Sequence, residues 1–187
     1  MTGVDELMAT VHKRLNVGSG RWPIGCYTNC DADPEQPAEI HATVPPIPLP
    51  DASLEDVWAC HFLEHLDHDT AIEFVRECWR VLEPGGRLAL VVPDTREIMR
   101  RWLAGAIDQV EIGPGQWFKV SDLDAVCAMF LYSPVQDSPH KWSYELPTLR
   151  RLVERNGFTF SREIDRYRDL RLGSGQWYQC GAEWVKA

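Results

Sequence analysis

The chain of 187 residues is long enough to bury one hydrophobic core, and its 44% hydrophobic and 25% charged residues are ordinary for a globular protein. Its formal net charge of -9 repels phosphate backbones and anionic lipid, so we expect neither nucleic acid nor a membrane among its partners. The six cysteines form no C-x-x-C pair, which predicts a protein of the reducing cytoplasm. No apolar run approaches the length of a membrane span, about 20 residues.

Short apolar stretches separated by turns occupy the first third of the chain. The first predicted strand, Leu15 to Val17, runs directly into the turn Gly18-Ser19-Gly20. Further strands are predicted over Cys26 to Cys30, Glu39 to Val44 and Glu55 to Cys60, with loops rich in proline and acidic residues between them.

A helix over Asp67 to Leu82 is the clearest predicted element, because its apolar residues recur at helical spacing. Asp67 or Asp69 can cap its start, and Pro84-Gly85-Gly86 is expected to end it. A strand over Arg87 to Val92 follows. Strand, helix and strand in this order build a parallel sheet.

The segment from Asp94 to Lys141 is less regular and is treated as an insert in a single domain spanning residues 1–187. Within it we predict a helix over Arg96 to Leu103, a turn at Gly113-Pro114-Gly115 and a second helix over Leu123 to Tyr132.

Regular periodicity returns after the insert. A helix carrying Leu146, Leu149 and Val153 is expected to stop at Asn156-Gly157. Strands over Phe158 to Ile164 and Trp177 to Val185 would pair as an antiparallel hairpin on one edge of the sheet. The predicted fold is therefore α/β, with a mostly parallel twisted sheet, helices on both faces and a C-terminal antiparallel hairpin.

The glycine turn after the first strand is a candidate ligand site. Gly18 and Gly20 would let the backbone approach a ligand closely, and Asp31, after the next strand, could accept the hydroxyls of a ribose or simply end that strand in a turn. Asp31 follows Gly20 more closely than the roughly 20 residues of the dinucleotide fingerprint, and Trp22 replaces its third glycine. NAD binding is therefore not predicted.

The run His61-Phe62-Leu63-Glu64-His65 matches the inverted zinc-protease signature H-x-x-E-H. On a helix the two histidines would share a face and bind a metal, with Glu64 as base, provided that a third ligand came from downstream. The alternative is that His65 caps or packs at the start of a helix. Because the run directly follows a predicted buried strand, we assign no metal ligand and keep a zinc hydrolase as a rival hypothesis.

Several stretches together resemble the class I S-adenosylmethionine-dependent methyltransferases, in the short form of the methyltransferase type 11 group. The resemblance covers Leu15 to Asp94 and resumes at His140-Lys141-Trp142 and over Leu149 to Phe158. The stretches that carry it are Leu15 to Gly20, Asp31, Ile47-Pro48-Leu49-Pro50-Asp51-Ala52-Ser53-Leu54, Val57 to Leu66, and Arg80-Val81-Leu82-Glu83-Pro84-Gly85-Gly86-Arg87-Leu88.

The resemblance implies a Rossmann-like fold with S-adenosylmethionine as cofactor. Gly18, Ser19 and Gly20 would cradle its methionyl part and Asp31 would hold its ribose. Asn16 stands where many relatives carry an acid near the methionyl ammonium, and an amide can still accept a hydrogen bond there. Cys60 and His61 would face the cofactor across the cleft.

The expected reaction is methyl transfer to a small molecule or a saccharide, at oxygen by analogy with relatives. A hydroxyl acceptor needs a general base poised near neutral pH, so His61, His65 and His140 are the candidate catalytic residues. His140 lies just before the late helix, where relatives often close the acceptor side.

Two departures from the family pattern keep another hypothesis open. Asn16 lacks the charge of the acid it replaces, and Thr43 lies near the place where relatives contact the adenine amino group with an acid. The resemblance also begins almost at the first strand, so a lid over the acceptor would come from the insert, from a second copy or from a partner chain. The alternative function is a non-catalytic partner subunit that binds S-adenosylmethionine.

Overall fold

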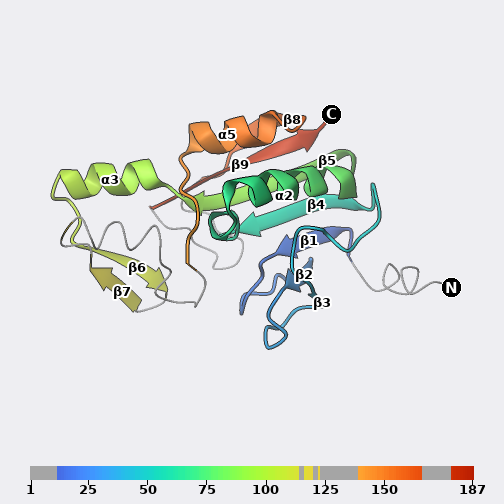
Figure 1. Cartoon of the computed structure of the whole chain (residues 1–187), viewed down its shortest axis with the longest axis horizontal. Coiled ribbons are helices and arrows are strands. Elements are labelled where there is room, and N and C mark those ends of the chain that lie inside the picture. Colours follow the sequence, from blue (N-terminus) through green and yellow to red (C-terminus); the bar gives the residue numbers. More distant parts are fainter. Residues whose placement is uncertain (1–11, 114–115, 120–121, 123–138, 166–177) are drawn as a thin grey trace.

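A computed structural model describes residues 12–113, 116–119, 122, 139–165 and 178–187. Seven strands form one sheet in the order β3-β2-β1-β4-β5-β9-β8 (Figure 1). Those strands are β1 (Arg14–Val17), β2 (Thr28–Asp31), β3 (Ile40–His41), β4 (Leu54–Cys60), β5 (Leu82–Pro93), β8 (Phe158–Glu163) and β9 (Gln179–Lys186). The other elements are the 3-10 turn η1 (Leu63–His65), the helices α2 (His68–Val81), α3 (Thr95–Leu103) and α5 (Leu146–Glu154), and a hairpin of β6 (Gln109–Gly113) and β7 (Gln116–Lys119).

The strand directions confirm the predicted Rossmann-like fold. Strands β1 to β5 pair in parallel, whereas β9 pairs antiparallel with both β5 and β8. The last two strands are therefore the expected antiparallel hairpin, with β8 at the edge of the sheet.

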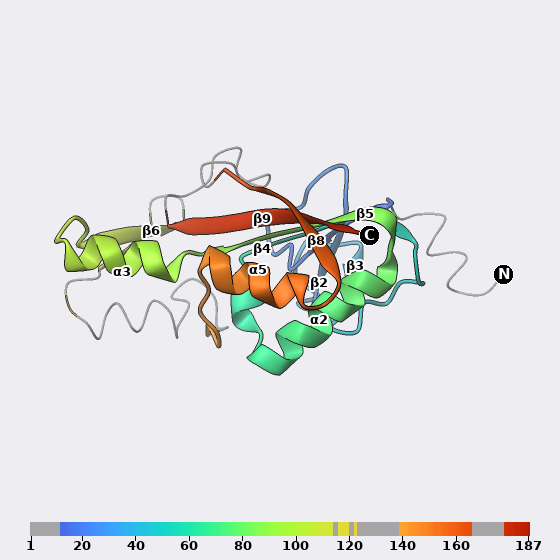
Figure 2. The ribbon, with the colours of Figure 1, turned by 90° about the horizontal axis from the view of Figure 1, so that it is seen from above.

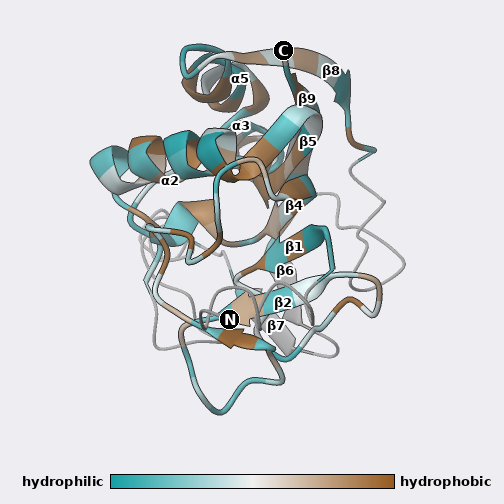
Figure 3. Cartoon of the chain, turned by 90° about the vertical axis from the view of Figure 1, so that its right-hand side faces the viewer, coloured by the Kyte–Doolittle hydropathy of each residue, from teal (hydrophilic) through white to brown (hydrophobic). Residues whose placement is uncertain are grey.

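The main core lies between the sheet and helices α2 and α5, which cover the same face (Figure 2). Alternate strand residues such as Leu15 and Val17 point into this core because side chains alternate along a strand. The helix residues that meet them include Phe74 and Val75 of α2 and Leu149 of α5. Figure 3 shows hydrophilic and hydrophobic residues side by side on α2, as expected of an amphipathic helix.

The opposite face of the sheet carries a smaller buried cluster that includes Tyr27, Trp58 and Val91, and no helix of the described segments lies on it. Right-handed crossovers explain why. The chain crosses the sheet from β1 to β2 in the direction opposite to its crossing from β4 to β5. Because both crossovers are right-handed, a helix between β1 and β2 would lie on the face opposite α2. That connection contains Pro23 and Gly25 and forms turns only, so the expectation of helices on both faces is not met here.

Helix α2 has nearly the predicted bounds, since Asp67 and Leu82 are its N-cap and C-cap residues. Asp67 caps it by accepting hydrogen bonds from the Thr70 amide and hydroxyl, both 2.9 Å long. The expectation that Pro84-Gly85-Gly86 ends the helix is wrong, because the backbone is already extended at Leu82 and pairs there with Leu54. The Pro-Gly-Gly segment instead lies inside β5, where the register with β4 shifts.

Two of the stretches that carry the family resemblance are bonded to each other through Arg80 of α2. Its guanidinium donates to the carbonyl oxygens of Ile47 and Leu49 at 2.8 and 2.9 Å, and to the Asp51 carboxylate at 2.7 Å. Glu77 accepts from the same guanidinium and from the Ile47 amide. Arg80 therefore fixes the loop between β3 and β4 to the helix, which gives both stretches a structural role.

Lys186 of β9 also contacts α2. Its Nζ donates to the carbonyl oxygens of Trp79 and Leu82, both at 2.6 Å, and lies 5.2 Å from the centre of the Trp79 ring. A cation at the carboxyl end of a helix stabilises it by bonding free carbonyl groups and by opposing the helix dipole.

The insert differs from the prediction. Its first helix is α3, close to the expected bounds, but the antiparallel pair β6 and β7 was not predicted. The expected turn at residues 113–115 falls at the end of β6, with residues 114 and 115 outside the described part. The helix predicted over residues 123–132 also lies outside it. Strand β3 has two residues where a longer strand was expected over residues 39–44. None of the described helices is long and apolar enough to cross a membrane.

Candidate active site

The parallel strands β1, β2 and β4 end at the same edge of the sheet, where ligands of such folds bind. The turn after β1 has two glycines with positive φ, 65° at Gly18 and 50° at Gly20. The amides of Gly18 and Ser19 donate to the Cys30 carbonyl at 2.9 and 3.1 Å, and the Gly20 amide donates to the Asp31 carboxylate at 2.7 Å. The structure thus brings together Gly18, Ser19, Gly20 and Asp31, as expected.

Gly18 is required by its own surroundings. A Cβ atom there would lie 2.5 Å from Cδ2 of Phe62, and the positive φ disfavours any other side chain. The Phe62 ring also packs against Phe74, with ring centres 5.1 Å apart. The residue after β1 is therefore a glycine because an aromatic ring from the segment after β4 lies over it.

The turn also fits the methyl donor that the sequence resemblance implies. The Ser19 hydroxyl is buried and has no hydrogen-bond partner in the part of the chain described. It lies in the same turn whose Gly20 amide is bonded to the Asp31 carboxylate, and a carboxylate can accept the hydroxyls of a ribose. Gly18, Ser19, Gly20 and Asp31 are the residues that would hold this cofactor.

Asn16 and Cys60 are placed differently from the turn. Both are buried, with 1% of their surface exposed. The Asn16 side chain donates to Oδ1 of Asn29 in the neighbouring strand at 3.0 Å, and Cys60 packs with Trp58 and Val91 on the opposite face of the sheet. Their contacts with the cofactor stay predictions.

His61 directly follows β4 and has an unusual backbone. Its φ is 53°, and its amide donates to the Val91 carbonyl at 2.9 Å. A positive φ is strained for a residue with a branched ring side chain, and such strain is often found at functional sites. The ring lies between two side chains, with Nδ1 3.1 Å from Glu64 Oε1 and Nε2 3.2 Å from Gln179 Oε1.

The three candidate catalytic histidines meet around Glu64. We call Glu64, His61, His65 and His140 the Glu64 cluster. The rings of His65 and His140 stand edge to face with centres 4.8 Å apart. Their ring nitrogens and a Glu64 oxygen lie within 4.8 Å of one another. The Glu64 carbonyl accepts from the Lys141 amide at 2.7 Å, which fixes the segment that carries His140.

The zinc-hydrolase hypothesis required a helix with His61 and His65 on one face. The chain instead forms the 3-10 turn Leu63–His65, and His61 bonds to Glu64. The residues that could share a metal ion are Glu64, His65 and His140. The expected third residue from downstream is therefore present, but the set of residues differs from the one that the signature predicts.

The electrostatics of the Glu64 cluster follow from its burial. Burial alone would raise the pKa of Glu64, but the hydrogen bond from His61 and the nearby rings of His65 and His140 outweigh it and hold the pKa well below its usual range. Burial lowers the pKa of His140, although Glu64 acts in the opposite direction. At neutral pH the cluster therefore contains an ionised carboxylate and a neutral His140.

Sequence reasoning found the three histidines but assigned Glu64 a role only in the rival hypothesis, and it missed Gln179. The signal for Glu64 was an acidic residue between Leu63 and His65, directly after a buried strand, where a charge needs partners. Gln179 carries no such signal, because it comes from β9, far along the chain.

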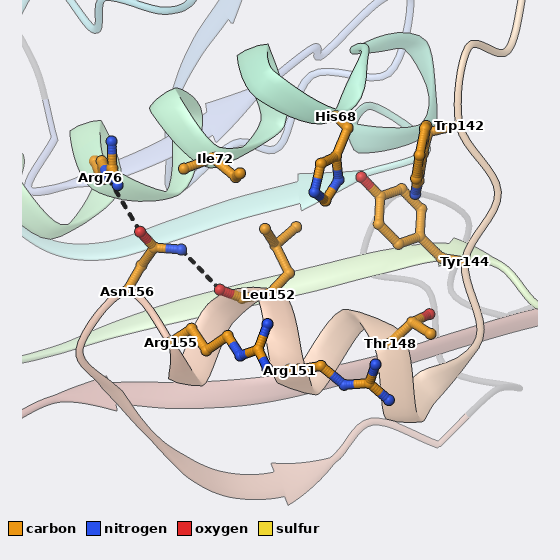
Figure 4. A pocket seen from close by; sticks show the side chains of 10 residues that line it. All are labelled: His68, Ile72, Arg76, Trp142, Tyr144, Thr148, Arg151, Leu152, Arg155 and Asn156. Atoms are coloured by element: carbon orange, nitrogen blue, oxygen red, sulfur yellow. Dashed lines mark hydrogen bonds between the residues drawn. The ribbon is translucent and has the colours of Figure 1, made fainter.

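A separate cavity of ≈ 440 Å³ lies between α2 and α5 (Figure 4). Aromatic and apolar side chains line it together with Arg76, Arg151 and Arg155. Trp142 stacks on His68 at its rim, with ring centres 4.7 Å apart. None of its lining residues belongs to the Gly18–Gly20 turn, to Asp31 or to the Glu64 cluster, so we do not place the methyl donor there.

Comparisons with known proteins agree with this geometry. The family model described as a methyltransferase domain matches residues 27–90. No curated protein sequence matches the chain. Solved structures share the fold at low sequence identity.

A methyltransferase from Thermotoga maritima, described as a possible histamine N-methyltransferase, has a TM-score of 0.58 at 14% identity, covering 99% of this chain and 87% of its own. A methyltransferase from Methanosarcina mazei has a TM-score of 0.59 at 15% identity, covering 92% and 91%. A third structure is a complex between the Haloferax volcanii Trm112 methyltransferase activator and a candidate methyltransferase, with a TM-score of 0.53, 12% identity and coverage of 97% and 88%.

Proposed function

Because residues 27–90 match the methyltransferase domain model and the fold matches S-adenosylmethionine-dependent methyltransferases, we propose that this chain is a class I enzyme of the methyltransferase type 11 group and that it methylates a hydroxyl oxygen of a small molecule or a saccharide. S-adenosylmethionine is the methyl donor of this family. Its sulfonium is already activated, so alignment of the acceptor and exclusion of water supply much of the catalysis. A hydroxyl acceptor additionally needs a base.

The observation that carries the proposal is the contact between His61 and Glu64 at the carboxyl end of β4. A carboxylate that accepts from Nδ1–H orients an imidazole and leaves Nε2 as the basic nitrogen. That nitrogen is 3.2 Å from Oε1 of Gln179, and both atoms are acceptors in this tautomer. The Gln179 amide would therefore turn its NH₂ group toward Nε2 or give way to an acceptor hydroxyl, which would then donate to Nε2. His61 would then take the hydroxyl proton while the oxygen attacks the methyl carbon and the sulfur leaves as a neutral thioether.

We do not assign this role to His65 or His140, because their described ring contact is with each other and not with His61. We propose Asp31 and the Gly18–Gly20 turn as the contacts of the cofactor. The net charge of -9 favours an uncharged or cationic acceptor over a nucleic acid. We also propose a cytoplasmic location, since the five cysteines of the described segments are free thiols.

The test is methyl transfer from labelled S-adenosylmethionine to a panel of hydroxyl-bearing small molecules and sugars, with the labelled atom identified by mass spectrometry. We expect His61→Gln to lower turnover by about 10²- to 10⁴-fold, the usual contribution of a general base, while S-adenosylhomocysteine still binds in calorimetry. Asp31→Ala should instead weaken that binding. Transfer to nitrogen, or full turnover by the His61 variant, would contradict the proposal.

A second candidate is a partner subunit that binds the cofactor without catalysis. It is favoured by the Asn16 side chain, which is engaged with Asn29. A second copy of this chain or another chain would then cover the acceptor site. Binding of S-adenosylhomocysteine without turnover on any acceptor, together with a dimer in sedimentation, would favour this candidate.

A further inference from the structure

The Glu64 carboxylate has one satisfied and one unsatisfied oxygen. Oε1 is 3.1 Å from Nδ1 of His61, whereas Oε2 is buried without a hydrogen-bond partner among the described residues. Only 2% of the side chain is exposed. Buried polar groups are nearly always paired, because an unpaired one loses its bonds to water without replacement. Oε2 therefore lacks a partner that the fold should supply.

Two histidines stand next to the Glu64 carboxylate. The ligand atoms of Glu64, His65 and His140 all lie within 4.8 Å of one another. Imidazole nitrogens and carboxylate oxygens bind zinc at about 2.0 to 2.2 Å, which places two ligands of one tetrahedral ion about 3.4 Å apart. Small side-chain rotations would bring the three atoms to that spacing.

We propose that Glu64, His65 and His140 form a binding site for one divalent transition metal ion of the zinc class. Glu64 would contribute Oε2, and each histidine one ring nitrogen. Two histidines and one glutamate are a ligand set of catalytic zinc sites, which leave a fourth position for water or a substrate oxygen. The site departs from the sequence-based expectation that the chain has no metal ligand, and it does not depend on the proposed acceptor.

The surroundings of the three side chains resemble those of known metal sites in two respects. Carboxylates that bind a metal are themselves hydrogen-bonded, and His61 would play this part through Oε1. The segment that carries His140 is also held in place, because the amides of Lys141 and Trp142 both donate to the Glu64 carbonyl, at 2.7 and 3.2 Å. The site is thus built from two separate segments that are already joined.

The competing explanation is a network of hydrogen bonds in which a protonated histidine satisfies Glu64 without a metal. To separate the two, the full chain is freed of metal with a chelator and titrated with Zn²⁺ against a chromogenic chelator. We expect one equivalent to bind and to raise the melting temperature, since a ligand of the native state stabilises it. Absence of a one-equivalent site in the wild-type chain would overturn the proposal.

Variants locate the site. Glu64→Gln and His140→Ala should each weaken Zn²⁺ binding at least about tenfold. His68→Ala is the matched control, because this histidine is exposed and stacks on Trp142 outside the site, and it should bind Zn²⁺ like the wild type. Circular dichroism checks that each variant folds. If Glu64→Gln does not fold, the Zn²⁺ affinity of His140→Ala serves as the test instead. Unchanged affinity in a folded variant would overturn the assignment.

Binding of one Zn²⁺ equivalent could also come from cysteine ligands elsewhere in the chain. Co²⁺ in place of Zn²⁺ distinguishes them, because thiolate ligands give strong charge-transfer absorption in the near ultraviolet, and nitrogen and oxygen ligands do not. A spectrum without thiolate bands is expected, and strong bands would overturn the proposal. Failure of methyl transfer would leave the metal result unaffected, since the titration needs neither donor nor acceptor.

Discussion

Replacing Arg80 by alanine removes the bonds that fix the β3–β4 loop to α2. The two bonds to the carbonyls of Ile47 and Leu49 each involve a charged donor, which contributes about 1.5 kcal/mol at the lower end of the usual range. The ion pairs with Asp51 and Glu77 add little, because the Asp51 side chain is 79% exposed and the Glu77 pair joins residues three apart on one helix. We therefore expect a loss of roughly 3 kcal/mol, or about 6 to 12 °C in melting temperature for a domain of this size.

The assay is urea unfolding followed by far-ultraviolet circular dichroism. Arg76→Ala is the control, because this residue lies on the same helix but makes an exposed bond to Asn156, and its loss should cost at most about 0.5 kcal/mol. Arg80→Lys keeps the charge but cannot span both carbonyls, so it should fall between the two. If Arg80→Ala cost no more than Arg76→Ala, the structural role of the two family stretches would be refuted.

Two further predictions concern other parts of the molecule. Gly18→Ala should lower the free energy of unfolding by about 2 to 4 kcal/mol, because of the positive φ and the clash with Phe62. Adding Phe62→Leu should recover part of this loss in urea unfolding. Strictly additive effects of the two substitutions would show that the clash is absent. The bonds from Arg100 and then Arg101 lower the pKa of Glu97 to about 2, so its contribution to stability is complete above its usual pKa of 4.5 and is lost as the pH falls toward 2. The stability difference between wild type and Glu97→Gln should accordingly shrink over this interval, and a difference independent of pH would speak against the ion pairs.

The strands of the sheet and the helices that cover it could be predicted where local sequence patterns determine them. Short apolar runs marked β1 and β4, apolar alternation marked β5, and the 3.6-residue period together with Asp67 marked α2. The end of α2 was predicted to within one residue, but the cause was not: Pro84-Gly85-Gly86 was expected to stop the helix, whereas the backbone is already extended at Leu82, which pairs with Leu54. Tertiary pairing overrode a local signal.

The candidate site residues could be named from the sequence, but their arrangement could not. The glycines and Asp31 share one strand edge, which follows from parallel topology. The Glu64 cluster depends on a contact between residues 61–65 and His140 across the insert, and no local pattern specifies it. Helices on both faces were expected from the fold class, yet the short link from β1 to β2 has no room for one.

The place of β9 in the sheet has a consequence for biosynthesis. Strand β5 pairs with β4 on one side and with β9 on the other, where Pro93 lies opposite Gln179. The second pairing therefore joins residues that are far apart in the chain. As the polypeptide leaves the ribosome, a long row of backbone amides and carbonyls on β5 stays open until β9 has emerged. Nascent chains of this protein should accordingly be most prone to associate with one another, or to recruit chaperones, in the interval between synthesis of the two strands.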